Sequence, residues 1–272
     1  MCDAGEVFLA RRPADNIAAP ESLQRALSPR SLKVVWENEL GGLTFEAVDD
    51  HDRVFVKWAP TGSKVNLRAE ADRLEWAQSH TPVPHVLDYG TDQDGQWLVT
   101  SALPGRSAVD ERWQAAPSLA VAAIGTGLRA LHEMLPTGDC PFEWSVQARV
   151  AEARRQTDAG EQQPRAWHES HRSLSIQEAL AGIAEPPGVD RLVVCHGDAC
   201  APNTILDDDG RWTGHVDFGS MGLADRWADL AIATWSTEWN YGPGWQSHLL
   251  DAYGIEPDPE RTAYYRLLWD LT

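Results

Sequence analysis

Hydrophobic and polar residues alternate in the first third of the chain, and this period of two predicts short β-strands. Leu32, Val34 and Trp36 hold every second position of the first such stretch. Glycine and aspartate turns separate the stretches, and a run with helical spacing follows over residues 67–78. The predicted strands cover residues 31–37, 43–48, 54–58 and 97–101, with another beginning at Val86. The pattern therefore predicts an antiparallel meander with one helix.

After about residue 116, the apolar positions take on helical spacing. The predicted helices cover residues 116–135, 146–156 and 261–272, and a further helix opens at 223–230. Short buried strands are predicted at 192–195, 204–206 and 212–216. The aromatic stretch 235–245 contains two glycines and a proline, which predicts a loop. A strand-rich first part and a mainly helical second part indicate an α+β fold.

Polar residues at a distinctive spacing lie beside the short strands of the second part. His196-Gly197-Asp198 follows the first of them, Asn203 comes five residues after Asp198, and Asp217 opens Asp217-Phe218-Gly219. Phosphoryl transfer needs a base that orients a hydroxyl and oxygen ligands that hold Mg²⁺ on the phosphates. The same spacing occurs in the catalytic loop of kinases. We therefore interpret Asp198 as the catalytic base and Asn203 and Asp217 as Mg²⁺ ligands. The alternative is a structural role, in which Asp198 only caps a helix.

A glycine turn and a lysine mark the strands of the first part. The Gly41-Gly42 turn would let backbone N–H groups approach a phosphate, with the Thr44 hydroxyl beside them, although an ordinary hairpin turn explains the glycines equally well. Lys57 is the candidate for the α- and β-phosphates of a nucleotide. Glu70 in the following helix is its expected ion-pair partner, with Glu75 as the alternative. This order of elements resembles the nucleotide-binding lobe of a kinase.

Charge and composition restrict the class of partner. The 272 residues are 43% hydrophobic and carry a formal net charge of −18. Nucleic-acid binding draws on clustered lysine and arginine, so no nucleic-acid partner is expected. A polycationic substrate suits this charge, but acidity that only aids solubility suits it equally well. No apolar run reaches the ~18 residues of a membrane span, and the N-terminus lacks a signal-peptide pattern. We expect a cytoplasmic protein with no membrane and no obligate protein partner.

The four cysteines, Cys2, Cys140, Cys195 and Cys200, raise the question of disulfides or zinc. Disulfides are not expected in a cytoplasmic protein. Cys195 and Cys200 flank His196, but no set of four ligands with zinc-site spacing is present. We therefore expect no zinc site.

Several motifs together resemble the aminoglycoside phosphotransferase family of antibiotic kinases. They are H-G-D-x-x-x-x-N from His196, D-x-G from Asp217, D-C-P from Asp139 and A-D-R-x-x-D-L-A from Ala224. The resemblance runs from about Ser31 to the C-terminus. It implies a bilobal protein-kinase-like fold, with a small antiparallel-sheet N-terminal lobe and a larger, mostly helical C-terminal lobe. Residues 1–103 would form the nucleotide-binding lobe, with the first ~30 peripheral, and residues 104–272 the catalytic and substrate-binding lobe.

The resemblance also implies a ligand set. ATP with Mg²⁺ would be the phosphoryl donor, and the Ser101 carbonyl and Leu103 N–H would contact adenine. The acceptor would be a cationic aminoglycoside whose phosphorylation confers antibiotic resistance. Asp270, Glu169 and Glu238 would pair with its ammonium or guanidinium groups. Asp229 would support the catalytic segment.

This chain departs from the sequence patterns of some family members, and these differences indicate which hydroxyl of the drug is the acceptor. The 3′-kinases of kanamycin and neomycin often end in L-L-D-E-F-F, whereas this chain ends in Leu267-Leu268-Trp269-Asp270-Leu271-Thr272. Ser220 replaces the arginine of D-x-G-R, and Ala201 replaces an acid. H-G-D-x-C-x-P-N and a final leucine-threonine pair resemble the streptomycin 3″-kinases, so streptomycin is the predicted substrate.

Three alternatives stay open. The first is a 3′-phosphotransferase acting on kanamycin or neomycin. The second is a metabolic kinase that phosphorylates choline, an amino sugar or a similar alcohol. The third is a catalytically silent kinase-like binding module, which the intact set of Lys57, Glu70, Asp198, Asn203 and Asp217 disfavours.

Overall fold

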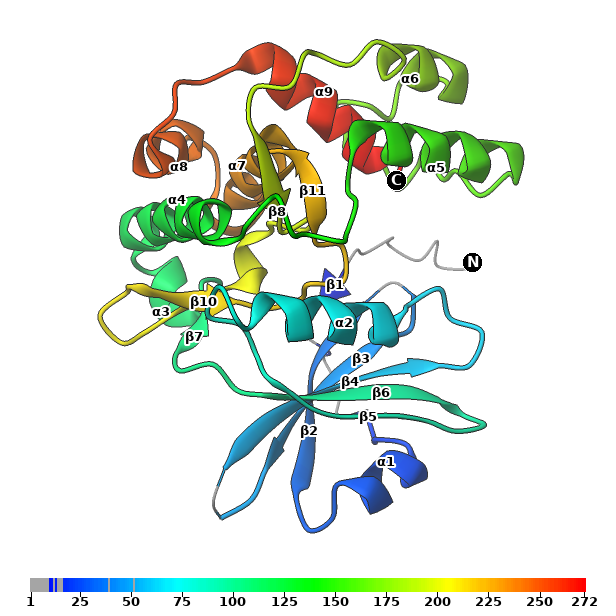
Figure 1. Ribbon diagram of the computed structural model, residues 1–272, viewed down its shortest axis with the longest axis vertical. Helices are drawn as coiled ribbons and strands as arrows, with labels where there is room; N and C mark the ends of the chain where they lie inside the picture. The colour runs from blue at the N-terminus through cyan, green and yellow to red at the C-terminus, as the bar shows by residue number, and fades with distance from the viewer. Residues whose placement is uncertain (1–9, 12, 14–16, 39, 51) are drawn as a thin grey trace, which may run out of the picture. The chain divides into compact units, whose positions relative to one another are not determined.

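The computed structural model describes residues 10–11, 13, 17–38, 40–50 and 52–272. Cys2 and the other residues 1–9 lie outside the described residues, as do residues 12, 14–16, 39 and 51. The chain divides into two compact units (Figure 1), one formed by residues up to 78 with 84–102, the other by 79–83 with 103–272. The assignment of residues 1–103 and 104–272 to a nucleotide lobe and a catalytic lobe stays a prediction.

The first unit is an antiparallel sheet with two helices (Figure 1). Its elements are β1 (Ala10–Arg11), α1 (Glu21–Ala26), β2 (Ser31–Asn38), β3 (Leu43–Val48), β4 (Arg53–Pro60), α2 (Leu67–Ala77), β5 (Val86–Thr91) and β6 (Gly95–Ser101). The strand order is β1-β2-β3-β4-β6-β5, and every neighbouring pair is antiparallel. The meander expected from the period of two is confirmed.

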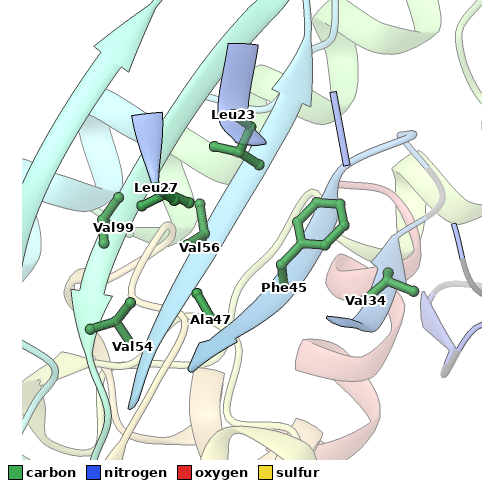
Figure 2. Close-up of a cluster of buried hydrophobic side chains, with 8 residues drawn as sticks. All are labelled: Leu23, Leu27, Val34, Phe45, Ala47, Val54, Val56 and Val99. Carbon is green, nitrogen blue, oxygen red and sulfur yellow. The ribbon is translucent and has the colours of Figure 1, made fainter. Parts of the chain in front are cut away.

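One hydrophobic cluster fixes the register of this sheet. Alternate residues of β3 and β4, Phe45 and Ala47 with Val54 and Val56, are at most 1% exposed. Leu23 of α1 and Leu27 beyond its end belong to the same cluster (Figure 2). A shift of one residue along either strand would turn the alternate side chains of that strand to the other face of the sheet. The strand that carries Lys57 is therefore held in a single alignment.

Helix α2 begins with an asparagine cap and buries one acid. The side chain of Asn66 accepts a hydrogen bond from the N–H of Ala69 at the first turn. The buried face carries Leu67, Ala71 and Leu74 at helical spacing, and it also carries Glu70, which is only 5% exposed. A buried carboxylate requires a partner, so this helix points to a specific ion pair.

The second unit is mainly helical. Its helices are α3 (Glu111–Gln114), α4 (Pro117–Met134), α5 (Val146–Asp158), α6 (Ile176–Gly182), α7 (Trp227–Tyr241), α8 (Gln246–Tyr253) and α9 (Pro259–Asp270), with the 3₁₀ turn η1 (Ala201–Asn203). Its strands are β7 (Arg106–Ser107), β8 (Leu192–Cys195), β9 (Thr204–Leu206), β10 (Trp212–His215) and β11 (Gly222–Asp225). They form a three-stranded sheet, β10-β9-β7, and a two-stranded sheet, β11-β8. The α+β class is confirmed.

Two local predictions around α7 are wrong. Leu223 to Asp225 do not open a helix, because they form β11, which pairs with β8 from Leu192 to Cys195. The stretch 235–245 is not a loop throughout, because α7 continues to Tyr241 and ends at Gly242, whose φ is +83°. The aromatic residues Trp235 and Trp239 are thus helical. None of the helices in the described part of the chain is both long and apolar enough to cross a membrane.

Candidate active site

The end of β8 turns sharply into the segment that carries Asp198. Gly197 has a φ of +84°, and a Cβ at this position would clash with the carbonyl oxygen of Ser220. Only glycine adopts this conformation in that space without strain. His196 is fully buried, and its Nε2 donates to the carbonyl oxygen of Val216, while its Nδ1 accepts from the N–H of Asp198. The turn therefore fixes Asp198 relative to the segment that leads into Asp217.

Asp198 and Asn203 are joined directly. Asn203 Nδ2 donates to the backbone oxygen of Asp198 at 2.9 Å and to its Oδ2 at 3.1 Å. The Asn203 side-chain oxygen is not used by these bonds. Oδ1 of Asp198 is buried and accepts no hydrogen bond from the described residues. A carboxylate that is held in place in this way is suited to orient a substrate hydroxyl and accept its proton.

Asp217 completes the set. It has a φ of +69°, the only positive value among the described non-glycine residues. Aspartate tolerates this region better than most residues, and strained backbone is common at functional sites. Burial and the negative charge of Asp217 raise the pKa of Asp198, against hydrogen bonds from Cys200 and Asn203. The Asp217 carboxylate and the Asn203 side-chain oxygen are donor types that suit Mg²⁺, and the positive charge of the ion would offset the repulsion between Asp217 and Asp198.

The buried carboxylate of Asp229 in α7 supports the same segment. Its Oδ2 accepts from the N–H of His196 at 2.6 Å, and its Oδ1 from the N–H of Gly197 at 2.9 Å. His132 Nε2 lies 2.9 Å from Oδ2. Burial alone would raise the pKa of Asp229, but the interactions with His132 and the backbone outweigh it and hold this pKa below its usual value. The contacts agree with the supporting role expected for Asp229.

His132, Cys195 and Asp229 place one possible metal-ligating atom each within 4.8 Å of one another. Each atom already has a protein partner. His132 Nδ1 lies 2.8 Å from the Tyr253 hydroxyl, and the Cys195 thiol donates to the backbone oxygen of Asp225. We interpret this cluster as a structural network beneath the catalytic segment.

Lys57 and Glu70 form an ion pair within the first unit. Lys57 Nζ lies 2.7 Å from Glu70 Oε1 and 2.9 Å from Oε2. The alternative partner, Glu75, is exposed and lies 4.0 Å from Arg68. Thr44 pairs with Lys57 across β3 and β4, so both side chains are on one face of the sheet. The nucleotide-binding role of these residues stays a prediction.

The other expected nucleotide contacts have local partners. The N–H of Gly42 donates to Asn38 Oδ1 at 2.7 Å. Ser101 ends β6, and its hydroxyl accepts from the N–H of His85 at 2.8 Å. Leu103 opens the stretch 103–272 of the second unit. No contact with adenine or phosphate follows from these bonds alone, so the assignments remain predictions.

Asp270, the predicted drug contact at the C-terminus, is engaged by the chain itself. Its Oδ2 accepts from the N–H of His168 at 3.0 Å and lies 2.6 Å from His171 Nδ1. The carboxylate side chain is 9% exposed. Sequence reasoning missed these partners, because roughly a hundred residues separate them from Asp270 and no local pattern connects them.

The two other predicted drug contacts differ in exposure. Glu169 is exposed. Glu238 lies in α7, half-buried, and accepts a hydrogen bond from the Gln246 side chain. Neither arrangement tests the predicted drug contacts, which stay predictions.

Comparison with known proteins places these features in a family. The sequence model of the phosphotransferase enzyme family matches residues 37–265. An aminoglycoside 3′-phosphotransferase from Streptomyces fradiae is 41% identical over 220 residues, covering 77% of this chain and 81% of that protein. A streptomycin 3″-kinase from Streptomyces griseus is 33% identical over 251 residues, covering 88% and 91%. The solved structure of aminoglycoside phosphotransferase APH(3″)-Id from Streptomyces rimosus with ADP and streptomycin has a TM-score of 0.69 at 30% identity, covering 84% and 90%.

Proposed function

The chain belongs to the phosphotransferase enzyme family, among the aminoglycoside phosphotransferases, and on this premise we propose that it transfers the γ-phosphoryl group of ATP to a hydroxyl of an aminoglycoside. Membership confirms the expected kinase-like α+β fold. The observation that carries the proposed chemistry is the direct contact between the Asn203 side chain and the Asp198 carboxylate, next to the negative charge of Asp217. We also propose that the protein acts in the cytoplasm.

The reaction is an in-line displacement at phosphorus. The acceptor hydroxyl oxygen forms a bond to the γ-phosphorus, the bond from that phosphorus to the β–γ bridging oxygen breaks, and ADP leaves. Asp198 orients the hydroxyl and accepts its proton at the carboxylate. Asn203 and Asp217 would hold Mg²⁺, which neutralises charge on the phosphate oxygens. Asn203 also fixes the Asp198 carboxylate through Oδ2.

Lys57 is the cation that we propose for the nucleotide. Glu70 is only 5% exposed and holds Lys57 Nζ through both carboxylate oxygens. A paired lysine keeps a defined rotamer, so its charge is pre-organised for the α- and β-phosphates. Thr44, its cross-strand neighbour, adds a hydroxyl on the same face.

For the acceptor we propose the 3″-hydroxyl of streptomycin. The chain ends in Trp269-Asp270-Leu271-Thr272, which lacks the aromatic and doubly acidic end of many 3′-kinases. The one remaining acid, Asp270, is bound by His168 and His171. The similarity to a streptomycin 3″-kinase over 88% of the chain supports this choice.

A 3′-hydroxyl of kanamycin or neomycin is the second candidate. The specific observation in its favour is the 41% identity to an aminoglycoside 3′-phosphotransferase. We have no comparable observation in favour of a metabolic alcohol kinase or a silent binding module. The two aminoglycoside candidates differ in the drug that is modified, so resistance separates them.

Bacteria that express the chain are expected to grow at streptomycin concentrations that stop cells expressing the Asp198→Asn variant. The reason is that phosphorylation removes the active drug, whereas binding alone depletes it only in proportion to the protein present. Growth in streptomycin, kanamycin and neomycin is measured in parallel. Resistance to kanamycin or neomycin alone would select the 3′-candidate, and sensitivity to all three at normal expression would contradict antibiotic phosphorylation.

A further inference from the structure

We propose that Ser236 is a positioning residue for phosphoryl transfer: its buried hydroxyl holds the 3₁₀ turn that presents Asn203 beside Asp198. Ser236 is fully buried in α7, and its Oγ accepts the N–H of Ala201 at 2.9 Å. The inference rests on the proposed phosphotransferase function and assigns a role to a residue that is neither base nor metal ligand.

The N–H of Ala201 has no other way to be satisfied within its own turn. Cys200, the residue before η1, provides no side-chain cap. Pro202 carries no N–H, and the N–H of Asn203 donates to the backbone oxygen of Cys200 at 3.0 Å. Ala201 therefore contributes the one donor of this turn that needs an acceptor from elsewhere. A buried N–H without an acceptor is costly, so the Ser236 hydroxyl stabilises this turn geometry directly.

A second anchor on the same helix holds the other end of the catalytic segment. Asp229 binds the N–H groups of His196 and Gly197, and Ser236 lies seven residues further along α7. Seven residues make about two helical turns, so both side chains project from one face, ~10.5 Å apart along the axis. The segment from His196 to Ala201 is thus fixed at both ends by a single rigid element.

These two anchors control the distance between Asp198, the proposed base, and Asn203, a proposed metal ligand. Asn203 ends η1 and reaches back to the Asp198 backbone oxygen and Oδ2. If the Ala201 N–H lost its acceptor, the turn would rotate to find another, and Asn203 would move with it. Both the orientation of the Asp198 carboxylate and the position of the Asn203 amide oxygen depend on the turn.

Asn240 orients the Ser236 hydroxyl. It lies one helical turn beyond Ser236, and its Nδ2 donates to the Ser236 backbone oxygen at 2.8 Å and to Oγ at 3.2 Å. Because this bond and the one from Ala201 both use Oγ as acceptor, together they hold the Ser236 oxygen in a defined position beside Ala201. Thr237 is also fully buried in α7, and among the described residues its side chain donates only to the backbone oxygen of Thr234 in the same helix.

The test compares Ser236→Ala with Thr237→Val, which removes a buried hydroxyl from the same helix without touching the catalytic segment. For Ser236→Ala we expect kcat to fall about 10- to 100-fold, the range that corresponds to one buried donor left unsatisfied. The KM for the acceptor should stay unchanged, and the Mg²⁺ concentration for half-maximal activity should rise. Hydrogen exchange at the Ala201 amide should become faster, which is a readout independent of turnover.

Thr237→Val should show neither the kinetic change nor the faster exchange. Asn240→Ala should show the same changes as Ser236→Ala at smaller size, and it carries the test if Ser236→Ala does not fold. The proposal is overturned if Ser236→Ala keeps the wild-type kcat and Ala201 exchange, or if Thr237→Val loses as much activity. If wild-type protein phosphorylates no aminoglycoside, the proposed function fails, while the exchange measurement still decides whether Ser236 holds the turn.

Discussion

Replacing Asp198 with asparagine is expected to lower kcat by roughly 10²- to 10⁴-fold, the usual contribution of a positioned base. The amide cannot accept the proton of the attacking hydroxyl. Its shape is unchanged, so the contacts with Asn203 can persist and Mg-ADP binding should remain. The measurements are ADP release with the aminoglycoside that supports turnover and calorimetric titration with Mg-ADP.

The same variant should fold at least as stably as the wild type. Burial and the charge of Asp217 raise the pKa of Asp198, which means that ionisation of Asp198 opposes folding near neutral pH. Asparagine removes that charge, so Tm should be equal or higher. Asp251→Asn, on the exposed side of α8, is the control and should change neither kcat nor Tm. A folded Asp198→Asn protein that keeps wild-type kcat, or one that cannot bind Mg-ADP, would contradict the role of base.

Asp229→Asn is expected to damage both folding and turnover. The Asp229 carboxylate is fully buried and accepts from His196, Gly197 and His132. Loss of one partner in such a buried charged network costs about 3–5 kcal/mol. For a unit of this size, even ~3 kcal/mol corresponds to a Tm lowered by roughly 6–12 °C. The catalytic segment loses its first anchor, so kcat should also fall well below that of the wild type at temperatures where the variant is folded.

Asp225→Asn provides the matched control for Asp229→Asn. Asp225 is also buried, but its carboxylate accepts from the backbone N–H groups of Trp227 and Asp190 and not from the catalytic segment. This variant should change Tm while kcat stays close to wild type. Thermal unfolding and ADP release are measured on both. Equal loss of kcat in the two variants would show that Asp229 acts only through general stability.

The sequence was most informative where a functional group and its partner have fixed positions in a motif. The spacing from Asp198 to Asn203 is short, and these residues contact each other directly. Lys57 and Glu70 also meet, because the strand and the following helix are close in the chain and the helix buries Glu70. Local spacing was enough to select these residues, although it says nothing of what they bind.

Sequence patterns failed where distant segments decide the outcome. Leu223 and its neighbours have helical composition, yet pairing with β8 makes them a strand. The histidines that engage Asp270 lie roughly a hundred residues earlier, so only the folded chain brings them together. Ser236 shows no motif of its own, and its spacing of seven from Asp229 becomes meaningful only once residues 227–241 are known to be one helix.

The most direct test of the central claim is acceptor-dependent release of ADP by the purified protein. Mg-ATP is supplied with streptomycin, with kanamycin or neomycin, or with no acceptor, and Asp198→Asn is assayed beside the wild type. We expect ADP release by the wild type with streptomycin, and almost none from the variant or without an acceptor. Release with kanamycin or neomycin alone would still support phosphotransferase activity, but it would favour a 3′-hydroxyl over the 3″-hydroxyl of streptomycin as the acceptor. The absence of release with every aminoglycoside would contradict the account.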